Sequence, residues 1–224
     1  MLRWILGSLL VLFLLLCAAV TGGWFWIQHK DFAALASAKF SQSLHRNVHI
    51  GHLHIHPGQW VTVDGEDLRI ANIPGGSRPD IITVGTVHAK LRLTSLLHGP
   101  LETRDVKIDH FSGLFERTSE RIPNWRFIPP EDQKRPPPAK NPEEKPDLCT
   151  FPSVGNLTIS NSDVTYRSAT GASYQVTMTQ ITLQSKNDVS PVKMSFQGEY
   201  NGTPVNLDAT MQSLEALRHV PEPY

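Results

Sequence analysis

The sequence predicts a mainly β protein, in which an N-terminal transmembrane helix and an amphipathic helix precede an antiparallel sheet and a short C-terminal helix. Three observations support this fold class. Residues 4–27 contain no charged side chain. Between residues 48 and 209, apolar residues recur at every second position in short runs, which is typical of strands with one buried face. Residues 129–147 show no such period and are rich in Pro, Lys and Glu, as in a solvated loop or linker.

Composition and charge limit the classes of partner. The chain has 224 residues, 40% of them hydrophobic, which is enough for one good core or two small ones. Lys plus Arg and Asp plus Glu balance at 21 each, so the charge indicates no nucleic acid partner. The pattern divides the chain into a membrane anchor (1–30), a helix with a β-meander (31–128), a Pro-rich linker or loop (129–147) and a second β segment (148–224).

Residues 4–27 are expected to cross a membrane. At 1.5 Å per helical residue they span the ~30 Å hydrocarbon core, and Trp4, Trp24 and Trp26 lie where interfacial aromatic residues are common. The alternative is a cleaved signal peptide, because small residues follow Cys17 at a plausible cleavage distance. The apolar run continues beyond them, which favours an uncleaved anchor. The basic residue before the span favours an exported body.

The segment from Asp31 to His45 has the period of an amphipathic helix, with Asp31 at the capping position. We expect a juxtamembrane helix whose apolar stripe comprises Phe32, Leu35, Ala36, Phe40 and Leu44. A second, short helix is expected at residues 213–219.

Strands account for most of the remaining sequence. The parity of the alternation changes across Gly51, which indicates a bulge or break. In the clearest strand, apolar and polar residues alternate in the order Val87, His88, Ala89, Lys90, Leu91, Arg92 and Leu93. Val106 and Ile108 repeat this pattern between charged residues. Residues 72–76 and 98–100 have the composition of turns, and further strand runs follow between residues 157 and 209.

The sequence contains no catalytic signature. There is no Gly-rich phosphate loop, no Gly-x-Ser-x-Gly elbow and no HExxH motif, so we expect neither an enzyme nor a cofactor. Cys17 lies in the expected span, which leaves Cys149 as the sole thiol of the body. A disulfide within the body is therefore excluded.

One histidine cluster is a candidate metal site. His45 and His49 precede His52, His54 and His56, and the last three would project from one face of a strand. Three imidazoles can share a metal ion, and nearby acidic residues at 64, 66 and 67 leave a metal-dependent hydrolase open. The simpler interpretation is a polar strand face opposite Leu53 and Ile55, and we expect no metal.

Several segments, in this order, resemble the AsmA family. They are residues 45–55 (HRNVHIGHLHI), 68–74 (LRIANIP), 87–93 (VHAKLRL), 96–99 (LLHG), 124–127 (NWRF), 157–166 (LTISNSDVTY) and 198–204 (GEYNGTP). The resemblance covers nearly the whole chain, although each motif is a degenerate β pattern. His45 stands where members often have Gly. Members usually continue well beyond this length, so the second β segment is expected to be truncated.

The resemblance implies a Gram-negative inner-membrane protein with a single span and a periplasmic body. It also implies a curved sheet whose apolar β-groove shields acyl chains during phospholipid transport or outer-membrane homeostasis. The phospholipid membrane is then the expected partner. Alternation assigns six candidate groove residues: Val87, Ala89, Leu91, Leu93, Val106 and Ile108.

Two other interpretations remain open. The same apolar stripe would also suit an ordinary core packed under a helix. Alternatively, the chain is a structural or assembly factor that contacts outer-membrane or periplasmic assembly proteins through exposed strand edges.

Overall fold

A computed structural model describes residues 32–92, 94–95, 101–118, 120–129 and 153–218. The expected membrane anchor, Leu93, Cys149 and most of the Pro-rich linker lie outside these residues. Within the described ranges, no helix has both the length and the apolarity that a membrane crossing requires.

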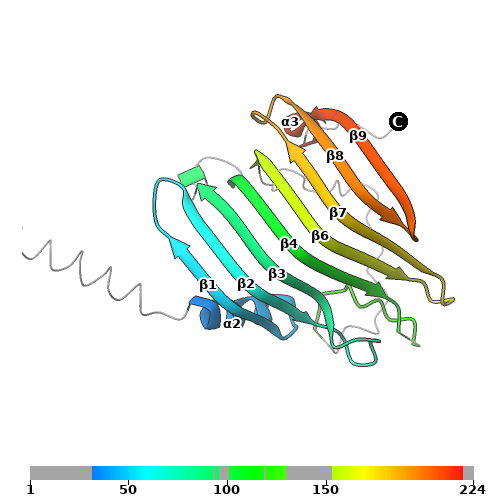
Figure 1. Ribbon diagram of the computed structural model, residues 1–224. Helices are drawn as coiled ribbons and strands as arrows, with labels where there is room; N and C mark the ends of the chain where they lie inside the picture. The colour runs from blue at the N-terminus through cyan, green and yellow to red at the C-terminus, as the bar shows by residue number, and fades with distance from the viewer. Residues whose placement is uncertain (1–31, 93, 96–100, 119, 130–152, 219–224) are drawn as a thin grey trace, which may run out of the picture. The chain divides into compact units, whose positions relative to one another are not determined.

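The body is a single curved sheet with a helix on one side. Helix α2 (Phe32–Leu44) is followed by β1 (Val48–His56), β2 (Val61–Ala71), β3 (Asp80–Arg92), β4 (Glu102–Glu116), β5 (Ser153–Val154), β6 (Asn156–Arg167), β7 (Ser173–Gln184), β8 (Pro191–Tyr200), β9 (Thr203–Ser213) and α3 (Leu214–Arg218). The sheet has nine strands in the order β1-β2-β3-β4-β6-β7-β8-β9, and β5 pairs beside β6 with β4. The mainly β fold and the short C-terminal helix predicted from sequence are confirmed (Figure 1).

The two β segments that flank the linker form one sheet. Their junction is the β4–β6 pair, which is parallel, whereas the other long strands pair antiparallel. Parallel pairing follows because residues 117–155 return the chain from the end of β4 to its start before β6 begins. The antiparallel prediction therefore holds for every pair of strands except β4–β5 and β4–β6.

A row of unusual backbone conformations crosses the sheet. Asp67, His110 and Asn161 have left-handed φ angles of 51°, 54° and 48°. The register places Asp67 opposite Gly51 on one side and Gly85 on the other, and Gly85 also faces His110. The irregularity predicted at Gly51 is thus present, but without an inserted residue in the β1–β2 pair. We call this row the crease.

Across the crease, the apolar residues of β2 change from odd-numbered to even-numbered positions but stay on the same face of the sheet. In a regular strand, residues 65 and 68 would point to opposite faces. A Cβ atom on Gly65 would instead lie 3.3 Å from Leu68, 3.8 Å from Leu53 and 2.9 Å from Val87. These side chains therefore share one face, because the left-handed residue at 67 reverses the alternation.

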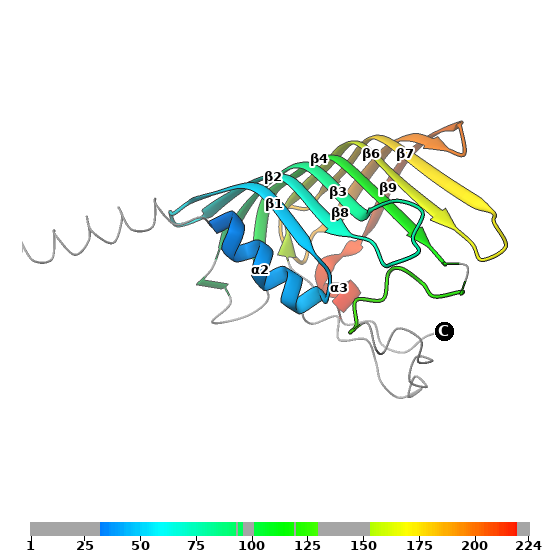
Figure 2. The same ribbon diagram turned by 90° about the horizontal axis from the view of Figure 1, so that it is seen from below.

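Helix α2 packs on the concave side of the sheet at β1 and β2 (Figure 2). The side it presents differs from the predicted stripe. Ala33 is buried with Val48 and Ile50, whereas Leu35 and Phe40 remain 58% and 54% exposed. Of the predicted stripe, Ala36 and Leu44 do pack against this cluster.

Small residues are favoured in this contact because α2 also binds the edge of β1. The backbone N–H of Val48 donates to Ser41 Oγ at 2.8 Å, and that of Ile50 donates to Ser37 Oγ at 3.1 Å. A bulky stripe would hold the helix too far away for these bonds. The serines thus satisfy part of an otherwise unpaired strand edge.

The segment after β4 is fixed by a buried asparagine. The Asn124 side chain is fully buried. It accepts from the N–H of Glu116 at 2.9 Å and donates to the carbonyl of Leu114 at 2.9 Å and to Asn72 Oδ1 at 3.1 Å. Arg46 donates to the carbonyl of Arg126 at 3.0 Å. The Asn124 side chain thus completes backbone hydrogen bonds at the end of β4, and Arg46 holds the backbone of the segment that follows.

Candidate lipid-binding face and rim pocket

One face of the sheet is apolar along its whole width. Strand pairing aligns a transverse row of one residue per long strand: Leu53, Gly65, Val87, Ile108, Ile159, Ile181, Phe196 and Leu207. Directly paired residues share a face, so this row is a continuous apolar band. It lies on the concave side, since Leu53 packs toward α2.

The adjacent row has the opposite character. Its residues are His54, Asp64, His88, Lys107, Thr158, Thr182, Ser195 and Asp208. Each of them is polar, and by alternation they project from the convex side. The sheet is thus amphipathic from one edge to the other.

The candidate groove residues on the described strands fall on the concave side. Val87 and Ile108 belong to the apolar row, while Ala89 pairs with Val63 and Leu91 with Val61 in parallel rows. Val106 pairs with Leu157. A bulge lies at Asp105, whose φ is 49°. It shifts the β3–β4 register by one residue, so that Val106 faces the same side of the sheet as the apolar residues of β3. The sixth candidate, Leu93, lies outside the described residues.

The concave face is covered by α2 at β1 and β2 and is exposed at some positions of β7 and β9. Tyr174 on β7 is 44% exposed and Leu207 on β9 is 47% exposed. Near the end of β6, Trp125 lies 5.9 Å from the ring of Tyr166, which stacks on Tyr174 at 6.3 Å. Exposed apolar side chains that share one face of a folded domain are a feature of binding sites.

The histidines pair with single carboxylates on the convex side. His52 Nδ1 lies 3.7 Å from Glu66, and His56 Nε2 lies 3.6 Å from Asp64. A closer pair joins His88 Nδ1 to Asp64 Oδ1 at 2.6 Å. Strand β2 therefore brings carboxylates next to this cluster. In the described part of the chain, no three His, Cys, Asp or Glu side chains converge in a way that would hold a metal ion.

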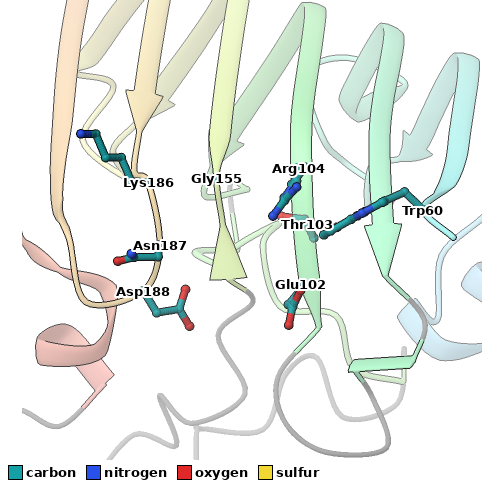
Figure 3. A pocket seen from close by; sticks show the side chains of 8 residues that line it. All are labelled: Trp60, Glu102, Thr103, Arg104, Gly155, Lys186, Asn187 and Asp188. Carbon is teal, nitrogen blue, oxygen red and sulfur yellow. The ribbon is translucent and has the colours of Figure 1, made fainter.

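A pocket of about 250 Å³ lies at one end of the sheet (Figure 3). Its lining includes Trp60, Glu102, Arg104, Lys186, Asn187 and Asp188. The Trp60 side chain reaches toward Arg104, while the last three of these residues come from the turn between β7 and β8. We call this the rim pocket.

Comparison with known protein families gives a match over most of the chain. The model of the AsmA family matches residues 1–216. The chain belongs to the AsmA family. Membership suggests a role in outer-membrane or lipid homeostasis. No curated protein matches the chain.

The rim pocket of this AsmA-family protein was not found by sequence reasoning. Trp60, Arg104 and Lys186 lie far apart in sequence and belong to no recognised motif. They line one pocket because the β1–β2 turn, the start of β4 and the β7–β8 turn are all at the same end of the sheet. The available signal was limited to a tryptophan next to a Pro-Gly turn.

Proposed function

We propose that this AsmA-family protein is anchored in the Gram-negative inner membrane by residues 4–27 and binds phospholipid acyl chains with its periplasmic body. In this role it contributes to phospholipid transport or outer-membrane homeostasis. The observation that carries the proposal is the apolar row from Leu53 to Leu207, which crosses every long strand of the sheet.

The energetics favour a lipid as the ligand of this face. Each methylene of an acyl chain that leaves water contributes about 0.8 kcal/mol, so a chain lying along the exposed part of the face is held without polar contacts. The proposal requires no catalytic group. It also accounts for the contrast between the two faces, since a sheet whose convex side meets water needs one apolar side only.

A photo-crosslinking experiment on the full chain tests the proposal. Leu207 is replaced by a benzophenone amino acid in Gram-negative cells, and the ultraviolet-induced adduct is identified by mass spectrometry. We expect a phospholipid adduct. The matched control places the same amino acid at Asn206, which is exposed on the opposite face of the same strand, and should give little lipid adduct. Equal lipid adducts at both positions would contradict the proposal.

A second candidate is a structural or assembly factor that acts through protein contacts. It is favoured by β9, the last strand in the sheet order, because no described strand pairs with its outer edge. Exposed strand edges bind partner strands by backbone hydrogen bonds. In the same experiment, a discrete protein adduct at residue 207 with no lipid adduct would support this function.

A further inference from the structure

Three tyrosines lie together at one end of the concave face. Tyr166 and Tyr174 pair directly across β6 and β7, and Tyr200, the last residue of β8, pairs with Val176 of β7. Paired residues share a face, as do residues two apart in a strand. Tyr200 lies four positions after Phe196 of the apolar row, so the shared face is the concave one. We call these three residues the tyrosine rim.

The concave residues of these strands change from tyrosine at one end to aliphatic side chains at the other. On β7, Tyr174 is followed on this face by Val176, Met178, Ile181 and Leu183. The tyrosine rim is open, because Tyr166, Tyr174 and Tyr200 are 39%, 44% and 47% exposed. At the opposite end, Val192 of β8 and Leu214 of α3 are only 4% and 9% exposed. The face therefore has one open end, and its side chains carry polar tips there.

Tyrosine suits a boundary between an apolar layer and a polar one. Its ring packs on hydrocarbon while its hydroxyl group donates a hydrogen bond, and for this reason Tyr and Trp are enriched at membrane–water interfaces. Within the part of the chain that the structure describes, no residue is hydrogen-bonded to the hydroxyl groups of the tyrosine rim. These donors are therefore available to a ligand that combines an apolar chain with oxygen acceptors.

An indole ring and a positive charge lie next to the tyrosine rim. The ring of Trp125 lies 5.9 Å from that of Tyr166, and the guanidinium of Arg117 lies 5.3 Å from the centre of the Trp125 ring. Arg117 is exposed. It donates to the carbonyl of Arg121 at 3.3 Å and, among the described residues, pairs with no carboxylate. A cation at this position complements the phosphate of a lipid headgroup.

The length of the face exceeds that of one phospholipid. Nine residue steps separate Tyr174 from Leu183 on β7, which is about 31 Å at about 3.4 Å per residue. A phospholipid is about 20–22 Å long, half the thickness of a bilayer with its headgroups. A lipid whose headgroup lies at Tyr174 would therefore place the ends of its acyl chains near Ile181, within the apolar row.

We propose that the tyrosine rim sets the orientation of a bound phospholipid. Its hydroxyl groups donate hydrogen bonds to the oxygens of the glycerol esters and the phosphate, and the acyl chains run along the strands from Tyr174 toward Ile181. The inference rests on the proposed function, because it takes the ligand of the concave face to be a phospholipid. It adds a direction to that function: the headgroup lies at the end of the sheet opposite the rim pocket.

Fluorine NMR on the full chain measures this direction. The protein is labelled with 3-fluorotyrosine in micelles of an uncharged detergent, and each resonance is assigned with a single tyrosine-to-phenylalanine variant. Two phospholipids are added separately, one with a nitroxide on its headgroup and one with a nitroxide near the end of an acyl chain. Reduction of the nitroxide with ascorbate gives the reference spectrum. We expect the headgroup probe to broaden the signals of the tyrosine rim more than the acyl-chain probe does.

Leu183→Tyr supplies a matched reporter at the other end of β7. Leu183 lies on the concave side, since it pairs with Leu157 and Met194. The signal of this variant should show the reverse order, with more broadening by the acyl-chain probe. Unchanged resonances of the tyrosine rim in the absence of lipid verify that the variant keeps its fold.

A second measurement isolates the hydroxyl groups. Tyr174→Phe keeps the ring and should weaken binding of the headgroup-labelled lipid by about threefold to tenfold, the usual effect of losing one hydrogen bond. The remaining tyrosine signals report this binding in a titration. Thr177→Val is the control, because it removes an exposed hydroxyl group from the convex side of the same strand. It should bind like the wild type.

The outcomes distinguish the orientation of the lipid from its binding. Equal broadening of the tyrosine rim by both probes, or stronger broadening by the acyl-chain probe, overturns the inference and leaves the proposed function in place. Unchanged affinity in Tyr174→Phe overturns it as well, because the ring alone would then account for the contact. If neither probe broadens any signal and residue 207 gives no lipid adduct, the proposed function is rejected together with the inference.

Discussion

A Cβ atom on Gly85 would lie 2.9 Å from the Cβ atom of His110, so β3 and β4 fit together at the crease only because residue 85 has no side chain. The carbonyl oxygen of Asp109 is also close, at 3.2 Å. Neither neighbour is the flexible end of a side chain. The crease is therefore a tight backbone contact as well as a change of conformation.

Gly85→Ala is expected to lower the free energy of unfolding by about 1–3 kcal/mol, because the new methyl group forces the strands apart. Urea unfolding of the full chain, followed by far-ultraviolet circular dichroism, measures the change. Gly155→Ala is the control, since a Cβ atom there meets its nearest neighbour at 3.6 Å and should have little effect. Equal effects of the two substitutions would show that the crease is not sterically tight.

Ser41→Ala is expected to destabilise the α2–β1 contact by about 1 kcal/mol, because the N–H of Val48 loses its acceptor. The clearest measurement is hydrogen exchange at the Val48 amide, which should become faster. Ser43→Ala alters an exposed residue of the same helix and should leave that exchange rate unchanged. Unchanged exchange in Ser41→Ala would mean that the hydroxyl does not protect the strand edge.

Glu116 should make stability depend on pH. Burial raises the pKa of its carboxyl, but hydrogen bonds from Ser77 and Asn72 and the charge of Arg167 outweigh this and hold the pKa below its usual value of 4.5. The unfolded state then binds the proton more tightly, so this contribution is complete above pH 4.5 and is lost as the pH falls through the lower pKa of the folded state. The difference in unfolding free energy between the wild type and Glu116→Gln should therefore shrink toward acid pH. A difference that stays constant down to acid pH would disprove this linkage.

A charge introduced on the concave face should cost little unfolding free energy at an exposed position and much more at a buried one. Val192 on β8 is only 4% exposed, whereas Leu207 is 47% exposed. We expect Val192→Asp to cost about 3 kcal/mol or more, because it buries an unpaired carboxylate, and Leu207→Asp to cost less than about 1 kcal/mol. Thermal unfolding measures both. Comparable losses would mean that residue 207 lies in a closed core.

Alternation alone predicted the face on which Val87, Ala89, Leu91, Val106 and Ile108 lie, because a two-residue period is a local property of a strand. The same reasoning located the irregularity at Gly51. It did not predict that this irregularity extends to Asn161, since the alignment depends on strand register. Register also decides the parallel β4–β6 pair, which depends on a long connection that leaves no periodic signal.

The predicted face of α2 was right at Ala36 and Leu44 but wrong at Leu35 and Phe40, for a physical reason. Hydropathy selected Leu35 and Phe40, but Ser37 and Ser41 occupy the contact because they bond to backbone groups of β1. A hydropathy pattern cannot register a hydrogen bond to another element. The rim pocket was missed for the same reason, since Trp60 and Arg104 interact only after the sheet has formed.

The bonds from Ser37 and Ser41 have a consequence for self-association. Two copies that pair through their β9 edges form an antiparallel dimer with β1 at both outer ends. Helix α2 shields the first half of each of those strands. Further edge-to-edge pairing of such a dimer would then be hindered at the shielded half of β1.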